Sequence, residues 1–439
     1  MTRSLFPRLC VLLTGLTLTA CGLTANNVDL TTPSLPPAET NPPPTQESSP
    51  TREAATAAIE PPTPTYEPPL PPTGPPIDRL SPGQPVTISF IEMFDSIEGW
   101  GLGGSSSSFD HVLRTQDGGR TWEDVTPPEP AAPADRDPKE AGAAFLDGNH
   151  AWVVYSYPGG GYEPDEGKIV WRTADGGQSW QPSIPIEPDY DFLPLAMPFV
   201  DDQTGWIFAA SGYGMSHEYT SVYRTIDGGL TWERIIDPSS SEGVIDVCCK
   251  SGVDFADAHL GLVTYDQGPN VPVIVDWTSD GGLTWESHSL PAPEALYDPA
   301  EINAKFNGGT CRSISPDFLS AGTARLAVDC VISYDPRDVA SFLYSTSDGG
   351  QTWQIVPFPG GPVQWIGPEV GWSVGRDLYL TLDGGFSWTK VKSVTWDGQF
   401  SFVSQALGWA VARSEEAIAL VTTSDGGRSW TEIQPRIAP

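Results

Sequence analysis

The chain has 439 residues, of which 18% are charged, and it contains 45 Gly, 45 Pro and 16 Trp. This composition disfavours long helices and favours many short strands joined by tight turns. The formal net charge is −33, and residues 85–439 hold 19 Lys and Arg against 49 Asp and Glu. Nucleic acid is therefore excluded as a partner, because phosphate binding needs clustered cations. The same charge argues against adsorption to an anionic membrane surface.

The first twenty residues read as a processing signal. Arg3 and Arg8 are their only charges, and the apolar run at 9–20 is too short to span a bilayer. The run ends in Leu18-Thr19-Ala20-Cys21, which resembles a bacterial lipobox. We expect residues 1–20 to be removed and Cys21 to be lipidated; the alternative is an ordinary signal peptide that ends near a cysteine. The protein would then be anchored in the cell envelope, extracytoplasmic, with the lipid as its only contact with a membrane.

Residues 21–84 comprise the lipidated cysteine and a linker. Seventeen of the 63 residues from 22 to 84 are Pro, and no hydrophobic periodicity is present. Such a segment has too little apolar surface to offset its chain entropy by packing, so we expect a disordered tether. Pro-rich stretches favour polyproline II, which makes the tether extended.

One octet recurs seven times with the pattern Thr-x-Asp-Gly-Gly-x-(Thr or Ser)-Trp. The copies span residues 115–122, 173–180, 225–232, 278–285, 346–353, 381–388 and 423–430. The Asp side chain can accept hydrogen bonds from backbone N–H groups two or three residues further on, and Gly-Gly supplies the positive φ values of a tight hairpin. The octet therefore predicts a turn between two strands.

A second signal, a Gly-Trp pair at the start of an apolar run, precedes most octets. The pairs and their variants are Gly99-Trp100, Ala151-Trp152, Gly205-Trp206, Gly261-Leu262, Gly371-Trp372 and Gly408-Trp409. In the fifth unit, the most divergent one, we place Arg325-Leu326 there. Each unit thus consists of strand A, a turn, strand B with its Gly-Trp pair, a loop, strand C, the octet turn and strand D.

Four antiparallel strands repeated seven times predict an all-β fold: a seven-bladed β-propeller of four-stranded antiparallel blades over residues 85–439. The units span residues 86–127, 141–187, 192–237, 244–291, 311–357, 362–393 and 397–435. The first and last units each contain their own strands A and D. We therefore expect the ring to close with no strand exchanged between the termini, unless residues 82–86 add an edge strand.

The octets resemble Asp-box, or BNR, repeats. Together with the Gly-Trp pairs they are similar to the propellers of the photosystem II assembly and stability factor family, over roughly residues 86–435. The resemblance implies the propeller and says less about function, because sialidases, sortilin-type receptors and some glycoside hydrolases also carry Asp boxes.

The octet aspartates are expected to be structural. They are Asp117, Asp175, Asp227, Asp280, Asp348, Asp383 and Asp425. Each octet offers one carboxylate, too few oxygens for the six to eight that Ca²⁺ prefers. We predict no metal and no cofactor. Twelve of the 16 Trp lie in an octet or a Gly-Trp pair and are expected to pack the core, as is Trp277, which replaces the Arg found before other octets.

No catalytic motif is visible. Sialidase chemistry uses an Arg triad, and here the first strand, at 86–94, has no Arg. The five His do not cluster with metal-ligand spacing, and no Ser–His–Asp triad or phosphate-binding loop is present. We predict a non-enzyme, a binding or assembly scaffold. The alternative is a carbohydrate-active enzyme, either a glycoside hydrolase or a sialidase-like protein. A pair of facing carboxylates beside aromatic subsites would favour this alternative.

Four cysteines belong to the expected propeller. Cys311 on strand A and Cys330 on strand B are equidistant from the intervening turn near residues 319–321, so we predict a Cys311–Cys330 disulfide. Cys248 and Cys249 would then form a vicinal disulfide or stay free. The alternative is a pair of bonds that join blades four and five.

The two faces of the propeller should differ. The A–B and C–D turns share one face, here called the turn face, and the B–C and D–A loops share the other, the loop face. Long irregular loops fall almost entirely on the loop face, where binding sites are normally built. The candidate binding rim there comprises Tyr162, Glu163, Tyr213, His217, Tyr219 and Tyr297. We expect a monomer whose ligand is a protein or a glycan.

Overall fold

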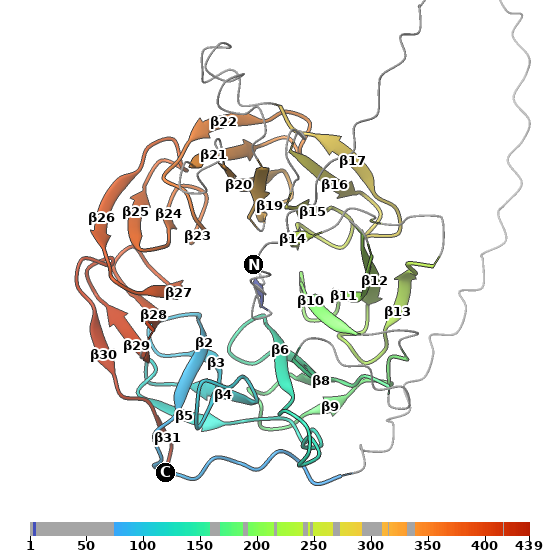
Figure 1. Cartoon of the computed structure of the whole chain (residues 1–439), viewed down its shortest axis with the longest axis vertical. Coiled ribbons are helices and arrows are strands. Elements are labelled where there is room, and N and C mark those ends of the chain that lie inside the picture. Colours follow the sequence, from blue (N-terminus) through green and yellow to red (C-terminus); the bar gives the residue numbers. More distant parts are fainter. Residues whose placement is uncertain are drawn as a thin grey trace, which may run out of the picture. The chain divides into compact units, whose positions relative to one another are not determined.

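The computed structural model confirms the seven-bladed β-propeller with four-stranded antiparallel blades (Figure 1). It describes residues 3–5, 74–158, 167–187, 192–214, 217–239, 245, 249–266, 273–291, 310–314, 316–331, 339–415 and 417–439. Within these ranges every regular element is a strand. The described part of the chain has no helix with the length and hydrophobicity to cross a membrane.

The first four blades are regular in strand order, from the innermost strand A to the outermost strand D. Blade 1 consists of β2 (Thr87–Met93), β3 (Gly99–Gly104), β4 (His111–Thr115) and β5 (Thr121–Asp124). Blade 2 consists of β6 (Glu140–Phe145), β7 (Ala151–Ser156), β8 (Val170–Thr173) and β9 (Gln181–Pro182). Blade 3 consists of β10 (Leu193–Ala196), β11 (Gly205–Gly214), β12 (His217–Thr225) and β13 (Glu233–Ile236). Blade 4 consists of β14 (Lys250–Phe255), β15 (Gly261–Tyr265), β16 (Ile274–Thr278) and β17 (Glu286–Ser289).

Strand A of blade 5 is divided into two strands, and the last two blades return to four. Blade 5 consists of β18 (Thr310–Ser313) and β19 (Asp317–Ser320), both paired with β20 (Thr323–Val331), then β21 (Val339–Thr346) and β22 (Gln354–Pro357). Blade 6 consists of β23 (Val363–Trp365), β24 (Gly371–Ser373), β25 (Asp377–Thr381) and β26 (Thr389–Ser393). Blade 7 consists of β27 (Asp397–Phe402), β28 (Gly408–Arg413), β29 (Ile418–Thr423) and β30 (Thr431–Ile433). A short β1 (Arg3–Leu5) pairs with β6.

Blade 1 holds both the start of the propeller and the end of the chain. No blade borrows one of its four strands, as expected. The added edge strand comes from the C-terminus, not from residues 82–86: β31 (Arg436–Ile437) lies parallel to β5. The Val86 N–H also donates to the Pro435 carbonyl at 3.1 Å. Ile437 is buried in the cluster between blades 7 and 1, which explains why the tail stays on the ring.

Neighbouring blades stack aromatic rings on one another. Trp206 of blade 3 lies 3.6 Å, centroid to centroid, from Phe255 of blade 4, with the rings 6° from parallel. Trp152 and Phe199 make the equivalent stack between blades 2 and 3. The glycine before the Trp is explained by Phe199, because a Cβ on Gly205 would lie 2.4 Å from that ring. The Gly-Trp pair is therefore a packing motif in which each residue serves a different contact.

In blades 2, 3 and 7 the indole N–H group of the Gly-Trp place also bonds the octet of the next blade around the ring. The Trp206 indole donates to the Gly281 carbonyl at 2.8 Å, and the Trp152 indole donates to the Gly228 carbonyl at 2.7 Å. Both acceptors are the first Gly of an octet. These turns are thus held by the preceding blade as well as by their own strands.

The assignment of Arg325-Leu326 to the Gly-Trp place in blade 5 is wrong by one residue. Ala324 pairs with the octet residue Thr346, as Gly205 pairs with Thr225 in blade 3. Ala324-Arg325 therefore fills the place, and Arg325 replaces the Trp. Its guanidinium donates to the Gly384 carbonyl at 2.8 Å, the same acceptor that an indole uses elsewhere. In blade 5 a long cationic side chain, Arg325, thus makes the contact with the next octet that was expected of Leu326.

Trp277 packs between blades, as expected for it. Its ring stacks edge-on against Phe318 of blade 5, with centroids 5.9 Å apart. A Cβ on Gly350, the second Gly of the next octet, would lie 2.4 Å from the same indole. In blade 3 the corresponding Arg224 lies against Gly281 and donates to the Ala258 carbonyl at 3.1 Å.

Candidate functional site

The carboxylates of the octet aspartates accept hydrogen bonds from donors within their own octet. The Asp280 carboxylate accepts hydrogen bonds from the Thr284 N–H at 2.9 Å, the Thr284 hydroxyl at 2.6 Å and the Thr278 hydroxyl at 2.8 Å. The same backbone bond, from the N–H four residues on, recurs at Asp117, Asp175, Asp227, Asp348, Asp383 and Asp425. The expected bond from the N–H three residues on is also present, as from Arg120 to Asp117 and from Leu230 to Asp227, so the turn contains both.

These hydrogen bonds stabilise the charged form of the carboxylates. At Asp348 and Asp425 the hydroxyl and N–H donors of Thr352 and Ser429 lower the pKa to about 2. The donors are supplied within the octet itself. In the described ranges no three His, Cys, Asp or Glu side chains are grouped so that they could hold a metal ion.

The turn face contains a second set of structural aspartates that the sequence analysis missed. The Asp95 carboxylate accepts the N–H groups of Ile97 and Glu98, each at 2.7 Å, in the A–B turn. Asp147, Asp201, Asp257 and Ser404 accept the equivalent pairs in other blades. Each precedes the Gly-Trp place by four residues, so the spacing was visible in the sequence. The turn face is consequently built from two interlocked turns in each blade.

The structure describes only part of the candidate rim. Tyr162, Glu163 and Tyr297 lie outside the described residues. Tyr213 and His217 belong to β11 and β12, where their backbones pair with Glu218 and Gly214, and their side chains lie outside the described part. Tyr219 is described and exposes 44% of its surface. The candidate site therefore starts from Tyr219 and its hairpin.

The β11–β12 hairpin extends to the loop face and is fixed to blade 4. Glu218 is buried, and its carboxylate accepts the Lys250 N–H at 2.9 Å, while the Lys250 ammonium donates to the Glu218 carbonyl at 3.2 Å. On the opposite side of the strand, the Tyr219 ring lies over Gly212 and Gly214, close to where their Cβ atoms would be. An exposed aromatic ring is therefore held on a ribbon that a neighbouring blade supports.

A second group of polar residues lies at the loop-face ends of blades 1 and 2. Asp110 contacts the Nδ1 atom of His111 at 3.0 Å. Burial alone would raise the pKa of Asp110, but hydrogen bonds from His111 and Ser108 outweigh it and hold that pKa below its ordinary value. Burial, with a smaller effect of Asp110, raises the pKa of Glu140. Two nearby carboxyl groups with pKa values pushed apart can act as an acid and a base.

Asp254 is a third notable carboxyl, and it joins blades 4 and 5. It accepts the Phe318 N–H at 2.8 Å and the Phe255 N–H at 2.9 Å. Burial raises its pKa to about 8 despite those two donors, and the neighbouring Asp317 adds to the effect. The hydrogen bond from Phe318 therefore makes Asp254 part of the contact between blades 4 and 5.

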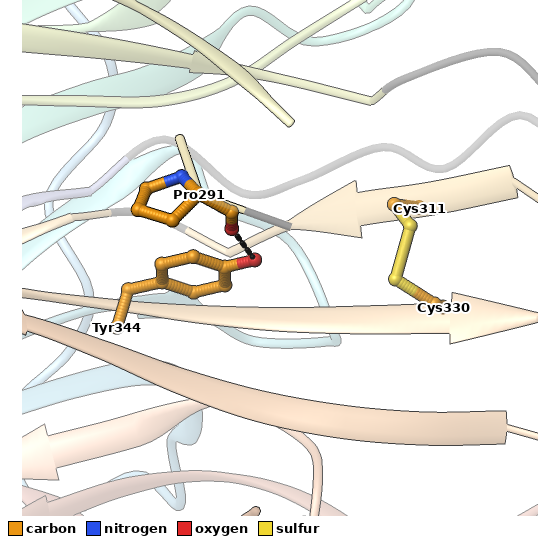
Figure 2. The surroundings of a disulfide bond; sticks show 4 residues. All are labelled: Pro291, Cys311, Cys330 and Tyr344. Carbon is orange, nitrogen blue, oxygen red and sulfur yellow. Dashed lines mark hydrogen bonds between the residues drawn. A yellow bond between two sulfur atoms is a disulfide. The ribbon is translucent and has the colours of Figure 1, made fainter. Parts of the chain in front are cut away.

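The disulfide lies within blade 5. Cys311 of β18 and Cys330 of β20 are register partners with Cα atoms 4.0 Å apart, and their sulfur atoms are bonded (Figure 2). The bond therefore does not join blades 4 and 5. Beside it, the buried Tyr344 hydroxyl donates to the Pro291 carbonyl at 3.0 Å (Figure 2). Cys249 is also disulfide-bonded, to a cysteine outside the described residues.

The chain is similar to several known proteins, each at low sequence identity. No family model matches the chain. A xyloglucanase from Paenibacillus sp is 23% identical over 303 residues, which cover 60% of this chain and only 27% of that protein. The structure of YCF48 from Cyanidioschyzon merolae matches with a TM-score of 0.44 and 16% identity, over 79% of this chain and 95% of that one. A xyloglucanase from Xanthomonas campestris matches with a TM-score of 0.30 and 12% identity, over 74% and 61%. The chain therefore spans about a quarter of the length of the curated xyloglucanase that it matches.

Proposed function

We propose that the protein is a non-catalytic binding or assembly scaffold of the cell envelope that holds a protein or glycan on its loop face. The observation that supports this most directly is the β11–β12 hairpin, where buried Glu218 fixes the strand and Tyr219 stays exposed. A ring held in this way can stack on a sugar or on a cationic or apolar side chain with little loss of side-chain entropy. Tyr219 would therefore be the centre of the binding surface.

The anchor is the second part of this proposal. Lipidation of Cys21 would keep the propeller at the membrane while the Pro-rich linker lets it reach outward. Cell fractionation tests this: Cys21→Ala should move the protein from the membrane to the soluble fraction, and Cys10→Ala should not. A membrane-bound Cys21→Ala protein would contradict the anchor without affecting the binding surface.

Binding can be tested with two defined ligands, xyloglucan oligosaccharides and a Lys-rich synthetic peptide that complements the acidic chain. Titration calorimetry on the full chain should show binding of one of them. Tyr219→Ala should weaken that binding by about tenfold or more, the range for loss of one stacked aromatic. Phe386→Ala is the matched control, because Phe386 is an exposed aromatic on the turn face. Binding that is unchanged in Tyr219→Ala, or absent for both ligands, would refute the proposed surface.

A glycoside hydrolase is the second candidate, and the Asp110–Glu140 pair favours it. Such enzymes use two carboxyl groups, one protonated and one ionised, which is the direction of the two pKa shifts. Release of reducing ends from xyloglucan that is abolished in Glu140→Gln would establish this function. Glu123→Gln, an exposed change on β5, is the control. Without such release from the native chain the scaffold is favoured.

A further inference from the structure

Residues 74–80, which precede the first blade, are docked on the loop-face end of blade 1. The Ile77 N–H donates to the Glu129 carbonyl, and the Ala131 N–H donates to the Pro75 carbonyl, each at 2.9 Å. The Arg79 guanidinium donates to the Asp124 carbonyl at 2.7 Å and to its carboxylate at 2.9 Å. The junction between linker and propeller is therefore a built contact.

His111 faces this junction with both ring nitrogens. Its Nδ1 atom lies 3.0 Å from the Asp110 carboxylate, and its Nε2 atom lies 3.0 Å from the Asp78 carbonyl and 3.8 Å from the Asp124 carboxylate. The ring is buried. A neutral imidazole has one N–H and can serve only one of these two contacts, whereas the imidazolium has two: Nε2 donates to the Asp78 carbonyl, and Nδ1 forms an ion pair with the Asp110 carboxylate.

We propose that His111 is a proton-operated clasp: its imidazolium holds residues 74–80 on blade 1, and loss of the proton frees Asp78. The Asp110 carboxylate carries a full charge and lies 3.0 Å from Nδ1, so its electrostatic attraction keeps the proton of the neutral ring on Nδ1. The Nε2 lone pair then faces the Asp78 carbonyl, and this contact becomes repulsive. Arg79 still holds Asp124, so the junction loosens locally while the propeller stays folded.

The surrounding charges set the direction of the effect. Burial lowers the pKa of His111, but Asp110, Asp124 and the Asp78 carbonyl outweigh it, so the pKa lies above its ordinary value of 6.5. The Asp110 carboxylate accepts a hydrogen bond from the Ser108 hydroxyl and lies near Glu140 of β6. The Asp110 carbonyl accepts a hydrogen bond from the Tyr155 hydroxyl of β7. Arg79 supplies a positive charge at the same junction. The clasp is therefore closed at and below pH 6.5 and opens as the pH rises through the pKa of the folded protein.

Opening would lengthen the connection to the linker. Because Arg79 stays bound to Asp124, only residues 74–78 are released, and five residues in polyproline II add roughly 15 Å of reach at about 3.1 Å each. The inference does not depend on which ligand the loop face binds, and it concerns only how far the propeller is held from whatever precedes residue 74.

Amide hydrogen exchange on the full chain tests the clasp. Protection factors of the Ile77 and Ala131 amides, which bond across the junction, should fall about tenfold between pH 6 and pH 9 after correction for the intrinsic pH dependence of exchange, the effect of one charged hydrogen bond. His111→Gln should show the low protection at every pH. His150→Gln is the matched control, since His150 also bonds an aspartate, Asp147, but on the turn face.

Two further measurements separate opening of the clasp from unfolding of blade 1. The Gly119 amide, which donates to Thr115 in the first octet, reports whether blade 1 remains folded in each variant. NMR of the His111 ring in the native chain reports its titration directly. Junction protection that stays constant while His111 titrates, or a folded His111→Gln variant that follows the native profile, would overturn the proposal.

Discussion

Asp254 is a residue whose protonation the fold controls. Its pKa rises from 3.8 to about 8 on burial between blades 4 and 5. A carboxyl with a higher pKa in the folded than in the unfolded chain stabilises the fold only while it is protonated. Its contribution is therefore complete below pH 3.8 and is lost as the pH rises through about 8.

Asp254→Asn should remove this pH dependence. The amide carries no charge to desolvate, and its oxygen can accept one of the two N–H groups that Asp254 binds, those of Phe255 and Phe318. We expect the free energy of unfolding at pH 9 to increase by about 1–2 kcal/mol, because the NH2 group faces the other N–H and offsets part of the gain. Urea unfolding followed by Trp fluorescence at pH 5, 7 and 9 measures it, with Asp135→Asn in an exposed loop as the control. Identical pH profiles for Asp254→Asn and the native chain would contradict the assignment.

At the scale of elements, the A–B hairpin depends on a glycine that faces an aromatic ring. Gly205→Ala would place a Cβ 2.4 Å from the Phe199 ring, which also stacks on Trp152 of blade 2. We expect a loss of about 1–3 kcal/mol in the free energy of unfolding from overpacking. Gly367→Ala is the control, because nothing lies within 4 Å of its Cβ. Equal denaturation midpoints for the two variants would show that the Gly-Trp pair is not set by this contact.

The sequence was sufficient for the elements that are encoded locally. The octet carries its own donors and acceptors within eight residues, so turn, strands and blade boundaries followed from the repeat. Blade 5 was misplaced by one residue because Arg325 meets its acceptor, Gly384, on another blade. Likewise the Glu218–Lys250 and His111–Asp78 contacts join residues more than thirty positions apart, so no local sequence pattern predicts them.

At the scale of the whole molecule, the C-terminal strand β31 forms a fifth strand on the outer edge of blade 1. Deletion of residues 436–439 removes the pairing of Arg436 and Ile437 with β5 and exposes the cluster that Ile437 covers. Loss of one buried isoleucine and its strand should cost about 2–4 kcal/mol. Calorimetry should show a lower melting temperature for this truncation and an unchanged one for deletion of Pro439 alone. A truncated chain that melts with the native one would show that blade 1 needs no fifth strand.

The meeting of the two chain ends at blade 1 has a mechanical consequence. A pull applied through residues 74–86 reaches the segment where Pro85 faces Arg436 and Val86 donates to Pro435. The two ends of the chain therefore reinforce each other where the tether enters the propeller. Tension between the tether and a ligand on Tyr219 would enter through blade 1, where the paired C-terminal segment resists the peeling of residues 85 and 86 from the ring.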